Sequence, residues 1–268
     1  MTVKIAIHGA AGRMGQSIAR VIHETDGAAL VAAVDHAAAA GRSMNDLVGA
    51  AGADLTIEDS LDRALAEADV IIDFTLPHAT AALLDRAKDS KTRIVIGTTG
   101  LTEETEAMIR ERASTRALVY APNYSQGVTA LFYLAELASR MMGPGFDAEI
   151  IEMHHRMKVD SPSGTALKLL EVVAAGKDLD PRADRVTGRD GQVGAREDRE
   201  IGVMALRGGD VVGEHTLYLS GLGERLELTH RATDRMIFAR GAVRAALFAA
   251  TKAPGLYDMF DVMGIERA

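Results

Sequence analysis

The residue types best suited to chemistry gather in one short stretch, residues 152–166. Four side chains that can carry positive charge fall within five positions there: His154, His155, Arg156 and Lys158. The chain as a whole is acidic, with a formal net charge of −8 at pH 7. A histidine can give or take a proton near neutral pH, and a neighbouring lysine attracts an anion. The stretch therefore predicts a site that binds an anionic substrate and transfers a proton.

The same stretch contains the expected start of a helix. Ser163-Gly164-Thr165 opens a segment with helical spacing, residues 163–175. Serine is favoured just before a helix, and the free backbone N–H groups behind it attract negative charge. A substrate carboxylate could be held by those N–H groups and the Thr165 hydroxyl, with Lys158 as the countercharge.

The two adjacent histidines constrain the local backbone. Neighbours in a regular strand point to opposite faces, so His154 and His155 serve one pocket only if the strand ends or twists at His154. The turn residues Asp160-Ser161-Pro162 favour such an ending. The alternatives are a solvated basic loop or a buried structural histidine. A metal site at Glu152 and His154 lacks any supporting His-Glu-x-x-His spacing, so we expect no metal.

A glycine-rich turn near the N-terminus predicts a nucleotide site. The turn, residues 8–15, follows an apolar strand-like segment and opens a helical one, residues 13–24. Small residues in its G-x-x-G-x-x-G pattern let backbone N–H groups approach a pyrophosphate. The alternative is a turn whose glycines serve only the backbone. We expect cofactor contacts from Gly9, Ala10, Ala11, Gly12, Arg13 and Met14.

An acid follows the second predicted strand. Asp35 stands twenty residues after Gly15 and is followed by His36. An acid here accepts hydrogen bonds from the adenosine ribose and repels a 2′-phosphate, although His36 and Arg42 could partly offset that repulsion. We therefore expect NADH to serve at least as well as NADPH. The alternative is that Asp35 is a solvated residue without a ligand.

Two later strand ends also carry candidate residues, because ligands bind beyond the carboxyl ends of parallel strands. Ordinary caps and turns are the alternative for each. We expect these residues near the nicotinamide: Gly97, Thr98, Thr99, Ala121, Pro122, Asn123 and Tyr124.

Apolar strands alternate with amphipathic helices as far as residue 120, which predicts a parallel sheet covered on both faces. A helix (126–142), a strand (148–154), the 163–175 helix and a polar stretch (176–199) come next. Three strands, 201–206, 211–220 and 225–232, have Gly-rich connections that predict antiparallel pairing. The last helix, 235–251, resembles those of the first half. We predict an α/β protein: a Rossmann-type domain from residues 1–125 and 235–268, and an α+β mixed-sheet domain from residues 126–234.

Composition excludes several classes of protein. The chain has no Cys, which removes disulfides, thiolate nucleophiles and zinc–cysteine sites. Its negative charge argues against general binding to nucleic acid or anionic membranes. No stretch approaches the roughly 20 apolar residues of a membrane span, and no signal peptide precedes the first strand. We expect a cytoplasmic protein.

The stretch EMHHRMKVDSPSGTA, residues 152–166, is similar to the signature of the dihydrodipicolinate reductase family. Five further segments match the same family in order along essentially the whole chain. They are GAAGRMG (9–15), DFT (73–75), GTTG (97–100), APNYS (121–125) and GLYDM (255–259).

The resemblance implies NADH- or NADPH-dependent reduction of 4-hydroxy-tetrahydrodipicolinate, via dihydrodipicolinate, to tetrahydrodipicolinate in diaminopimelate and lysine biosynthesis. It implies a central domain that holds this small dicarboxylate and builds a homotetramer. His154 would be the proton donor and Lys158 a second proton donor or anchor. The substrate carboxylate would be bound by His155, Ser163, Gly164 and Thr165.

The chain departs from the family at the cofactor ribose. Many members have an acid followed by a basic residue there, whereas this chain has Asp35-His36, and His36 is a weaker phosphate partner than arginine. Two rival functions stay open. One is another two-domain dehydrogenase, such as an aspartate or homoserine dehydrogenase. The other is a non-catalytic NAD(P)-binding sensor that recruits a partner protein.

Overall fold

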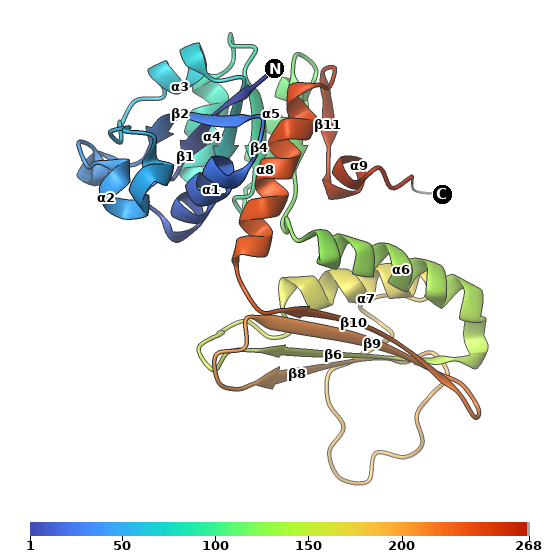
Figure 1. Ribbon diagram of the computed structural model, residues 1–268. Coiled ribbons are helices and arrows are strands. Elements are labelled where there is room, and N and C mark those ends of the chain that lie inside the picture. The colour runs from blue at the N-terminus through green and yellow to red at the C-terminus, as the bar shows by residue number, and fades with distance from the viewer. Residues whose placement is uncertain (267–268) are drawn as a thin grey trace. The chain divides into compact units, whose positions relative to one another are not determined.

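The structure, a computed structural model, describes residues 1–266. The chain divides into two compact units (Figure 1). The first combines Met1–Gln126 with the segment from Met236 onward, and the second is Gly127–Arg235. Within residues 1–266, no helix is both long enough and apolar enough to cross a membrane.

A six-stranded parallel sheet forms the centre of the first unit, with the strand order β11-β5-β4-β3-β1-β2. Its inner strands are short apolar runs buried on both faces, which is typical of a parallel sheet. The predicted Rossmann-type sheet is confirmed. The strands are β1 (Val3–His8), β2 (Ala28–Val34), β3 (Val70–Asp73), β4 (Arg93–Ile96), β5 (Ala117–Tyr120) and β11 (Gly255–Tyr257).

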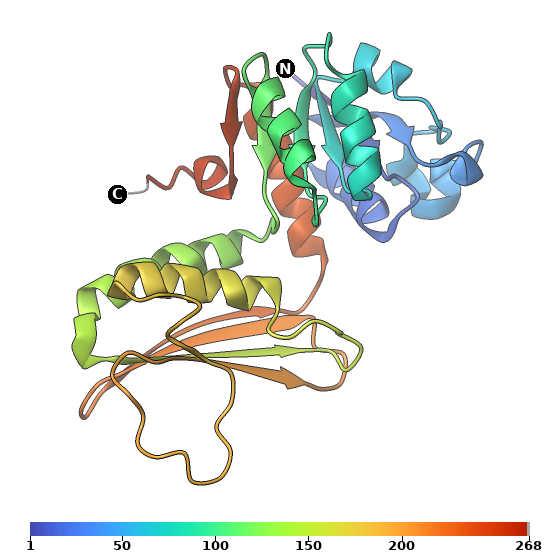
Figure 2. The same ribbon diagram turned by 180° about the vertical axis from the view of Figure 1, so that it is seen from behind.

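Helices cover both faces of this sheet (Figures 1 and 2). On one face, Ile5 and Ile7 pack with α1 (Arg13–Glu24) and α8 (Met236–Ala250). On the other face, Ala6 belongs to a core formed with α3 (Asp62–Glu67), α4 (Pro77–Arg86) and α5 (Glu103–Ala113). Side chains in a strand alternate between faces, so each strand from β1 to β5 contributes to both cores. Two short helices complete this unit, α2 (Met44–Val48) and α9 (Met259–Met263).

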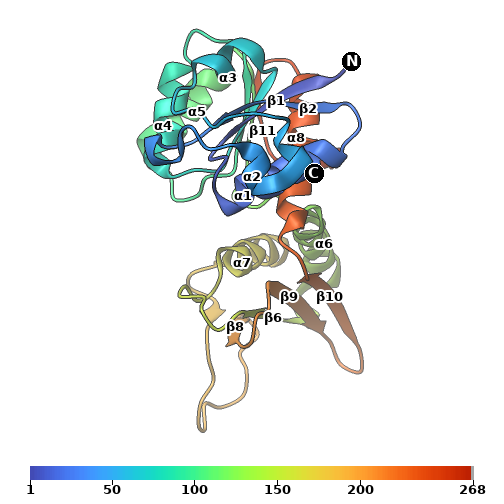
Figure 3. The same cartoon turned by 60° about the vertical axis from the view of Figure 1, so that its left-hand side comes forward.

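The second unit is a five-stranded mixed sheet with the order β10-β9-β6-β8-β7. Its strands are β6 (Asp147–His154), β7 (Arg185–Val186), β8 (Ile201–Arg207), β9 (Gly213–Ser220) and β10 (Arg225–Ala232). Its helices α6 (Gln126–Met142) and α7 (Gly164–Lys177) lie on the same face of the sheet (Figure 3). Gly176 lets them approach, because a Cβ there would lie 2.7 Å from the carbonyl oxygen of Glu136.

The predicted pairing of the last three strands is partly wrong. β9 and β10 pair antiparallel as expected. β8 does not pair with β9: β6 lies between them, parallel to β8 and antiparallel to β9. Closeness in sequence favours hairpins, but here the connection from β8 to β9 crosses β6. The central strand of this sheet is therefore the one that ends at His154.

The structure also contains elements that the sequence pattern did not predict, namely α2, α9, β7 and β11. Each has five residues or fewer, too short for an apolar period to be read. The predicted polar stretch 176–199 includes the end of α7 and the strand β7. The remaining long segments were placed within a few residues of their observed bounds.

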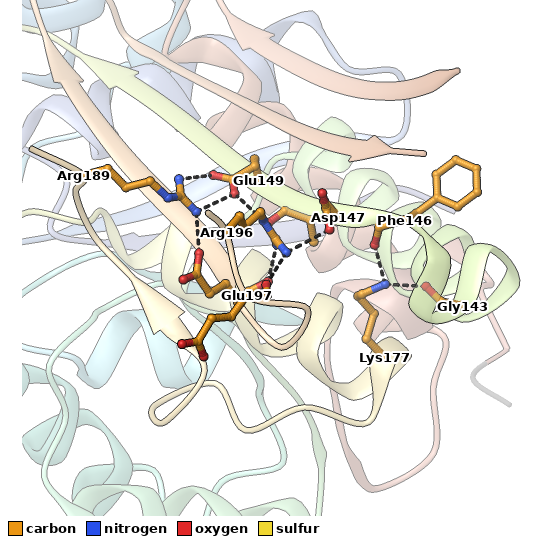
Figure 4. A network of polar contacts seen from close by, with 10 residues as sticks. Gly143, Phe146, Asp147, Glu149, Lys177, Arg189, Arg196 and Glu197 are labelled. Atoms are coloured by element: carbon orange, nitrogen blue, oxygen red, sulfur yellow. Dashed lines mark hydrogen bonds and ion pairs between the residues drawn. The ribbon is translucent and has the colours of Figure 1, made fainter. Parts of the chain in front are cut away.

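A network of charged side chains holds the loop between β7 and β8 against the sheet (Figure 4). The guanidinium of Arg189 contacts both carboxylate oxygens of Glu149, at 3.1 and 2.9 Å. Arg196 contacts Glu149 at 3.1 Å and Asp147 at 2.9 Å. Gly202 makes room for this network, because a Cβ there would lie 1.7 Å from a Glu149 carboxylate oxygen. Nearby, the Lys177 ammonium binds the carbonyl oxygens of Gly143 and Phe146.

Candidate functional site

A cleft of about 900 Å³ opens in the first unit beyond the carboxyl ends of three neighbouring strands. A volume of this size suits a small-molecule ligand. The cleft lies where an open parallel sheet binds ligands. Its walls include His8, Gly9, Ala11 and Gly12 after β1, Asp35 and His36 after β2, and Phe74 and Thr75 after β3.

The glycine-rich turn in this cleft fits a dinucleotide. Helix α1 begins at the turn, and its N-cap residue, Gly12, has no side chain that could cap the first turn. Gly9 has a φ of +90°, and a Cβ there would lie 2.5 Å from the carbonyl oxygen of Phe74. At Gly15, a Cβ would lie 2.2 Å from the carbonyl oxygen of Gly9. The turn thus requires glycine, and the N-terminus of the helix can receive a pyrophosphate.

Asp35 holds this turn in place from the end of β2. Its Oδ2 accepts a hydrogen bond from the Ala11 N–H over 2.8 Å, and its Oδ1 accepts one from the His36 N–H over 2.7 Å. A carboxylate oxygen can accept more than one hydrogen bond, so the cleft-lining Asp35 can also accept from a ribose hydroxyl. The His36 side chain is exposed, and Arg42 also lines the cleft.

The other predicted cofactor residues do not line this cleft. Ala10 and Ala121 are buried, Met14 and Asn123 are partly exposed, and Arg13, Thr99 and Pro122 are exposed. A Cβ at Gly97 would lie 2.1 Å from the Phe74 ring, so Gly97 makes room for that ring.

Thr98 and Tyr124 are buried and bind other parts of the first unit instead of lining the cleft. The Thr98 hydroxyl donates to the Asp73 carboxylate at 3.1 Å and accepts from the Thr75 N–H at 3.0 Å. The Tyr124 side chain is buried, its hydroxyl donates to the Ile96 carbonyl oxygen at 2.8 Å, and its ring centroid lies 5.5 Å from that of Phe74.

Sequence reasoning missed one polar pair beneath the cleft. Nδ1 of His8 lies 2.8 Å from Oδ1 of Asp73, although the angle is not that of a hydrogen bond. The Asp73 carboxylate is fully buried and accepts from the hydroxyls of Thr75, Thr80 and Thr98. His8 and Asp73 end neighbouring parallel strands in register. The signal was a titratable residue at the last position of each of two apolar strands.

The second unit positions His154 at the end of its central strand. β6 ends at His154, and the chain then turns away through His155. The strand therefore ends where it must if both histidines are to serve one pocket. His154 is only 9% exposed, while His155 is partly exposed. A Cβ at Gly213, in the adjacent strand β9, would lie 3.0 Å from Nε2 of His154. The absence of a side chain there leaves space beside that nitrogen.

Helix α7 begins directly beside this histidine. Ser163 caps the helix as predicted, because its hydroxyl accepts from the Ala166 N–H over 3.2 Å. The same hydroxyl lies 3.1 Å from Nε2 of His215, a buried residue of β9. The ring of His215 meets the ring of His154 edge-on, with centroids 5.2 Å apart. The predicted proton carrier and the predicted carboxylate cradle are therefore neighbours within one unit.

Glu152 is completely buried beneath His154. Its Oε2 lies 2.6 Å from Nδ1 of His154, and the Arg207 guanidinium binds both of its oxygens, at 2.8 and 2.9 Å. Burial alone would raise the pKa of Glu152, but hydrogen bonds from His154, Arg207 and the Ser163 N–H outweigh it and lower the pKa to about 2. Within residues 1–266, no group of three or more His, Asp and Glu side chains is arranged to hold a metal ion.

His215 and Arg207 are the residues of this site that sequence reasoning missed. Burial, followed by the nearby His154, lowers the pKa of His215 to about 4, so this ring is neutral at neutral pH. Arg207 stands opposite His154 in the register of β6 with β8. Both residues lie in strands whose positions were predicted, but the pairing that brings them to His154 was not.

The remaining predicted substrate residues surround the same corner. The Lys158 ammonium pairs with Asp160 at 2.8 Å and is partly exposed. This hydrogen bond from Lys158 lowers the pKa of Asp160. Gly164 is exposed at the first position of α7, and Thr165 is partly exposed next to it.

Comparison with known proteins places the whole chain in one family. The family model "Dihydrodipicolinate reductase, N-terminus" matches residues 3–124, and its C-terminal counterpart matches residues 127–263. Proteins named 4-hydroxy-tetrahydrodipicolinate reductase are 51% identical in Alkalilimnicola ehrlichii (99% of this chain, 100% of the relative) and 47% identical in Syntrophotalea carbinolica (98% and 100%).

A solved structure supports the same assignment. The dipicolinate-bound dihydrodipicolinate reductase from Paenisporosarcina sp. TG-14 is 26% identical, with a TM-score of 0.77 over 97% of this chain and 99% of that one. Both units of the fold and both halves of the sequence are included in these matches. The chain belongs to the dihydrodipicolinate reductase family.

Proposed function

We propose that this chain reduces 4-hydroxy-tetrahydrodipicolinate, via dihydrodipicolinate, to tetrahydrodipicolinate with NADH or NADPH, in diaminopimelate and lysine biosynthesis. Relatives that match over the full length are named for this activity, and the Paenisporosarcina structure is of the enzyme with dipicolinate, a planar dicarboxylate, bound. The observation that carries the proposal for this chain is the buried His154 beside the N-terminus of α7.

The proposed roles follow from the chemistry of the second unit. A carboxylate of the substrate binds at the start of α7, through the N–H of Gly164 and the hydroxyl of Thr165, with Ser163 shaping the helix start. Lys158 supplies positive charge, and His155 a hydrogen-bonding ring, at the open side of the same corner. A helix N-terminus and a cation both stabilise an anion.

The proton step is assigned to His154. The reduced nicotinamide supplies a hydride to one carbon of the unsaturated ring, and the electron-rich product collects a proton at the neighbouring carbon. His154 donates that proton, because an imidazole can be protonated near neutral pH and then recover its proton from water. Positive charge around the substrate carboxylates lowers the cost of negative charge that develops in the ring.

The cofactor is proposed to bind in the cleft of the first unit. The turn from Gly9 to Gly12 and the start of α1 hold its pyrophosphate, and Asp35 accepts from its adenosine ribose. NADH is expected to serve at least as well as NADPH, since the Asp35 carboxylate repels a 2′-phosphate. His36 and Arg42 reduce that repulsion because both lie in the cleft wall with Asp35.

We also propose a homotetramer built through residues 201–232. On the sheet face that points away from α7, apolar side chains recur at alternate positions of neighbouring strands, and Leu206 among them is 50% exposed. An apolar sheet face is a typical protein interface. The apolar side chains on this face are Ile151, Met153, Met204, Leu206 and Tyr218, and the charged Glu149 and Glu214 share the face with them.

A steady-state assay tests the proposed function directly. Freshly generated 4-hydroxy-tetrahydrodipicolinate is mixed with the purified chain and with NADH or NADPH in turn, and cofactor oxidation is followed. Turnover that depends on this substrate is the expected result. A non-catalytic sensor would bind the cofactor without turnover, and an aspartate or homoserine dehydrogenase would act on its own substrate instead. Either result would refute the proposal.

A further inference from the structure

The carboxylate of Glu152 is fully occupied by protein groups, although it lies directly beneath the proposed proton donor. It makes four contacts: with Nδ1 of His154 at 2.6 Å, with two Arg207 nitrogens at 2.8 and 2.9 Å, and with the Ser163 N–H at 3.0 Å. It is 0% exposed. Glu152 is therefore enclosed by its protein partners, so it acts on the reaction through them and not by contact with the substrate.

The sheet dictates this arrangement. Glu152 and His154 are two residues apart in β6, so their side chains lie on the same face. Arg207 is the register partner of His154 in the parallel strand β8, which places its guanidinium beside both side chains. Arg207 also donates to the carbonyl oxygen of Asp160 at 2.7 Å, so the loop that carries Lys158 is tied to the same guanidinium.

The pairing fixes which nitrogen of His154 keeps its proton. An ionised carboxylate only accepts hydrogen bonds, so Nδ1 of His154 must carry a proton toward Glu152. The bidentate guanidinium and the Ser163 N–H keep Glu152 ionised, consistent with its low pKa. The nitrogen left to exchange a proton is Nε2, which faces the space left free by Gly213.

We propose that Glu152 and Arg207 are positioning residues of the reduction. Glu152 fixes one proton of His154 on Nδ1 and stabilises its doubly protonated form, and Arg207 holds Glu152 in place and prevents it from taking that proton. The inference rests on the proposed function, because it assumes that His154 is the acid. In the proton step, Nε2–H breaks as the C–H bond forms on the ring, Nδ1–H is retained, and water returns a proton to Nε2.

The charged and titratable groups around His154 set the expected pH dependence. They are Glu152 on its own strand, Arg207 on β8, His215 on β9, and Lys158 with Asp160 on the loop before α7. His230 on β10 acts on His215. Of these, Glu152 is the anion in contact with the His154 ring and Arg207 is the cation in contact with Glu152. Removing the negative charge of Glu152 should therefore lower the proton affinity of His154, whereas removing the positive charge of Arg207 should raise it.

The test compares Glu152→Gln with Arg207→Gln in the full-length enzyme. Glu152→Gln is expected to lower kcat by about 10- to 100-fold, the range known for carboxylates that orient metal-bound histidines, with little change in the KM for substrate. The alkaline limb of its kcat profile should move to lower pH by roughly one unit or more, since an anion that favoured the protonated ring is gone. Arg207→Gln should also lower kcat, but its alkaline limb should move to higher pH.

Glu149→Gln is the matched control. Glu149 lies on the same strand and is also paired with arginines, but its side chain points to the opposite face and does not contact His154. Its kcat should change by less than about twofold, because its ion pairs are with Arg189 and Arg196 and none reaches the His154 ring. Arg207→Lys keeps the charge without the bidentate geometry and should recover part of the activity lost in Arg207→Gln.

Several outcomes would overturn the inference. A folded Glu152→Gln enzyme with kcat within about threefold of the unmodified chain and an unmoved alkaline limb would do so, because the expected loss is at least about tenfold. Alkaline limbs that move in the same direction in Glu152→Gln and in Arg207→Gln would also overturn it. If Glu152→Gln fails to fold, Arg207→Gln decides alone: its alkaline limb must move to higher pH. Failure of the proposed function is distinct, because the unmodified chain would then show no turnover.

Discussion

The Oδ2 atom of Asp35 accepts a hydrogen bond from the backbone N–H of Ala11 over 2.8 Å, so the acid that follows β2 holds the glycine-rich turn that follows β1. One carboxylate thus shapes the turn that would receive the pyrophosphate and stands where a ribose would bind. Cofactor preference and the geometry of the turn are consequently linked through a single side chain.

This link predicts how cofactor choice responds to charge. For the unmodified chain, kcat/KM with NADH should equal or exceed that with NADPH. Asp35→Asn keeps an acceptor oxygen but removes the negative charge, so it should raise the preference for NADPH relative to NADH. Parallel steady-state assays with both cofactors measure this. An NADPH preference above about tenfold in the unmodified chain, or 1.4 kcal/mol, would contradict the assignment.

His154→Gln should remove the acid while keeping a side chain of similar size. We expect kcat to fall by about 10²- to 10⁴-fold, with cofactor affinity nearly unchanged, because general acid catalysis contributes on this order. Kinetics and thermal unfolding are measured on the same preparation. A folded variant that keeps kcat within about threefold would show that His154 is a structural strand-end residue and that another group supplies the proton.

Thr165→Ala should raise the KM for substrate more than it lowers kcat. A carboxylate anchor contacts the substrate in both the ground state and the transition state, so its loss weakens binding with less effect on the chemical step. Pyridine-2,6-dicarboxylate should inhibit the unmodified chain competitively, and the variant more weakly. If both the KM and the inhibition constant stay the same, Thr165 does not contact the substrate.

His215 should make folding stability sensitive to mild acid. Its pKa falls from 6.5 to about 4 in the folded chain, first because it is buried. The unfolded chain takes up a proton below pH 6.5 while the folded chain does not, so stability is full above that pH and is lost as the pH falls toward 4. Between pH 7.5 and 5, the unmodified chain should lose roughly 2 kcal/mol more than His215→Gln.

Urea unfolding followed by circular dichroism at the two pH values measures the effect of His215. His23→Gln is the control, because His23 is exposed in the last turn of α1. That variant should lose as much stability as the unmodified chain. An equally large loss in His215→Gln would mean that His215 does not stay neutral in the folded protein.

Light scattering at micromolar concentration should give about four times the chain mass of 28.5 kDa. Leu206→Glu places a charge on the apolar sheet face that points away from α7, and it should yield smaller species because burial of an unpaired charge is costly. Leu76→Glu is the control, since Leu76 is 62% exposed and lies in the first unit. A single-chain mass for the unmodified protein would refute the tetramer.

Local patterns in the sequence predicted most of the first unit. The pattern of apolar residues identifies continuous strands such as Val70–Asp73 and helices such as Arg13–Glu24 within a few residues. Their types and approximate bounds could therefore be predicted directly. The turn at Gly9 and the cap at Ser163 were also predictable, because their chemistry depends on neighbouring residues. Each is a short-range property of the chain.

The partners of the candidate site could not be predicted in the same way. Arg207 reaches Glu152 across 55 positions of sequence, and His215 reaches Ser163 across 52. Both contacts depend on β6 lying between β8 and β9, a pairing that closeness in sequence predicted wrongly. Strand order is a long-range property, and nothing in the residues around Arg207 or His215 encodes it.

The first unit takes its last strand and one of its core helices from the end of the chain. β11 extends the sheet beside β5, and the alanines of α8 fill the core against Ile5 and Ile7. During synthesis on the ribosome, residues 127–235 emerge as an unbroken segment. The first 126 residues, in contrast, cannot complete their core until α8 has emerged. The nascent first unit therefore exposes the part of its sheet that α8 covers until that helix has emerged, and apolar surface exposed in this way is prone to aggregation.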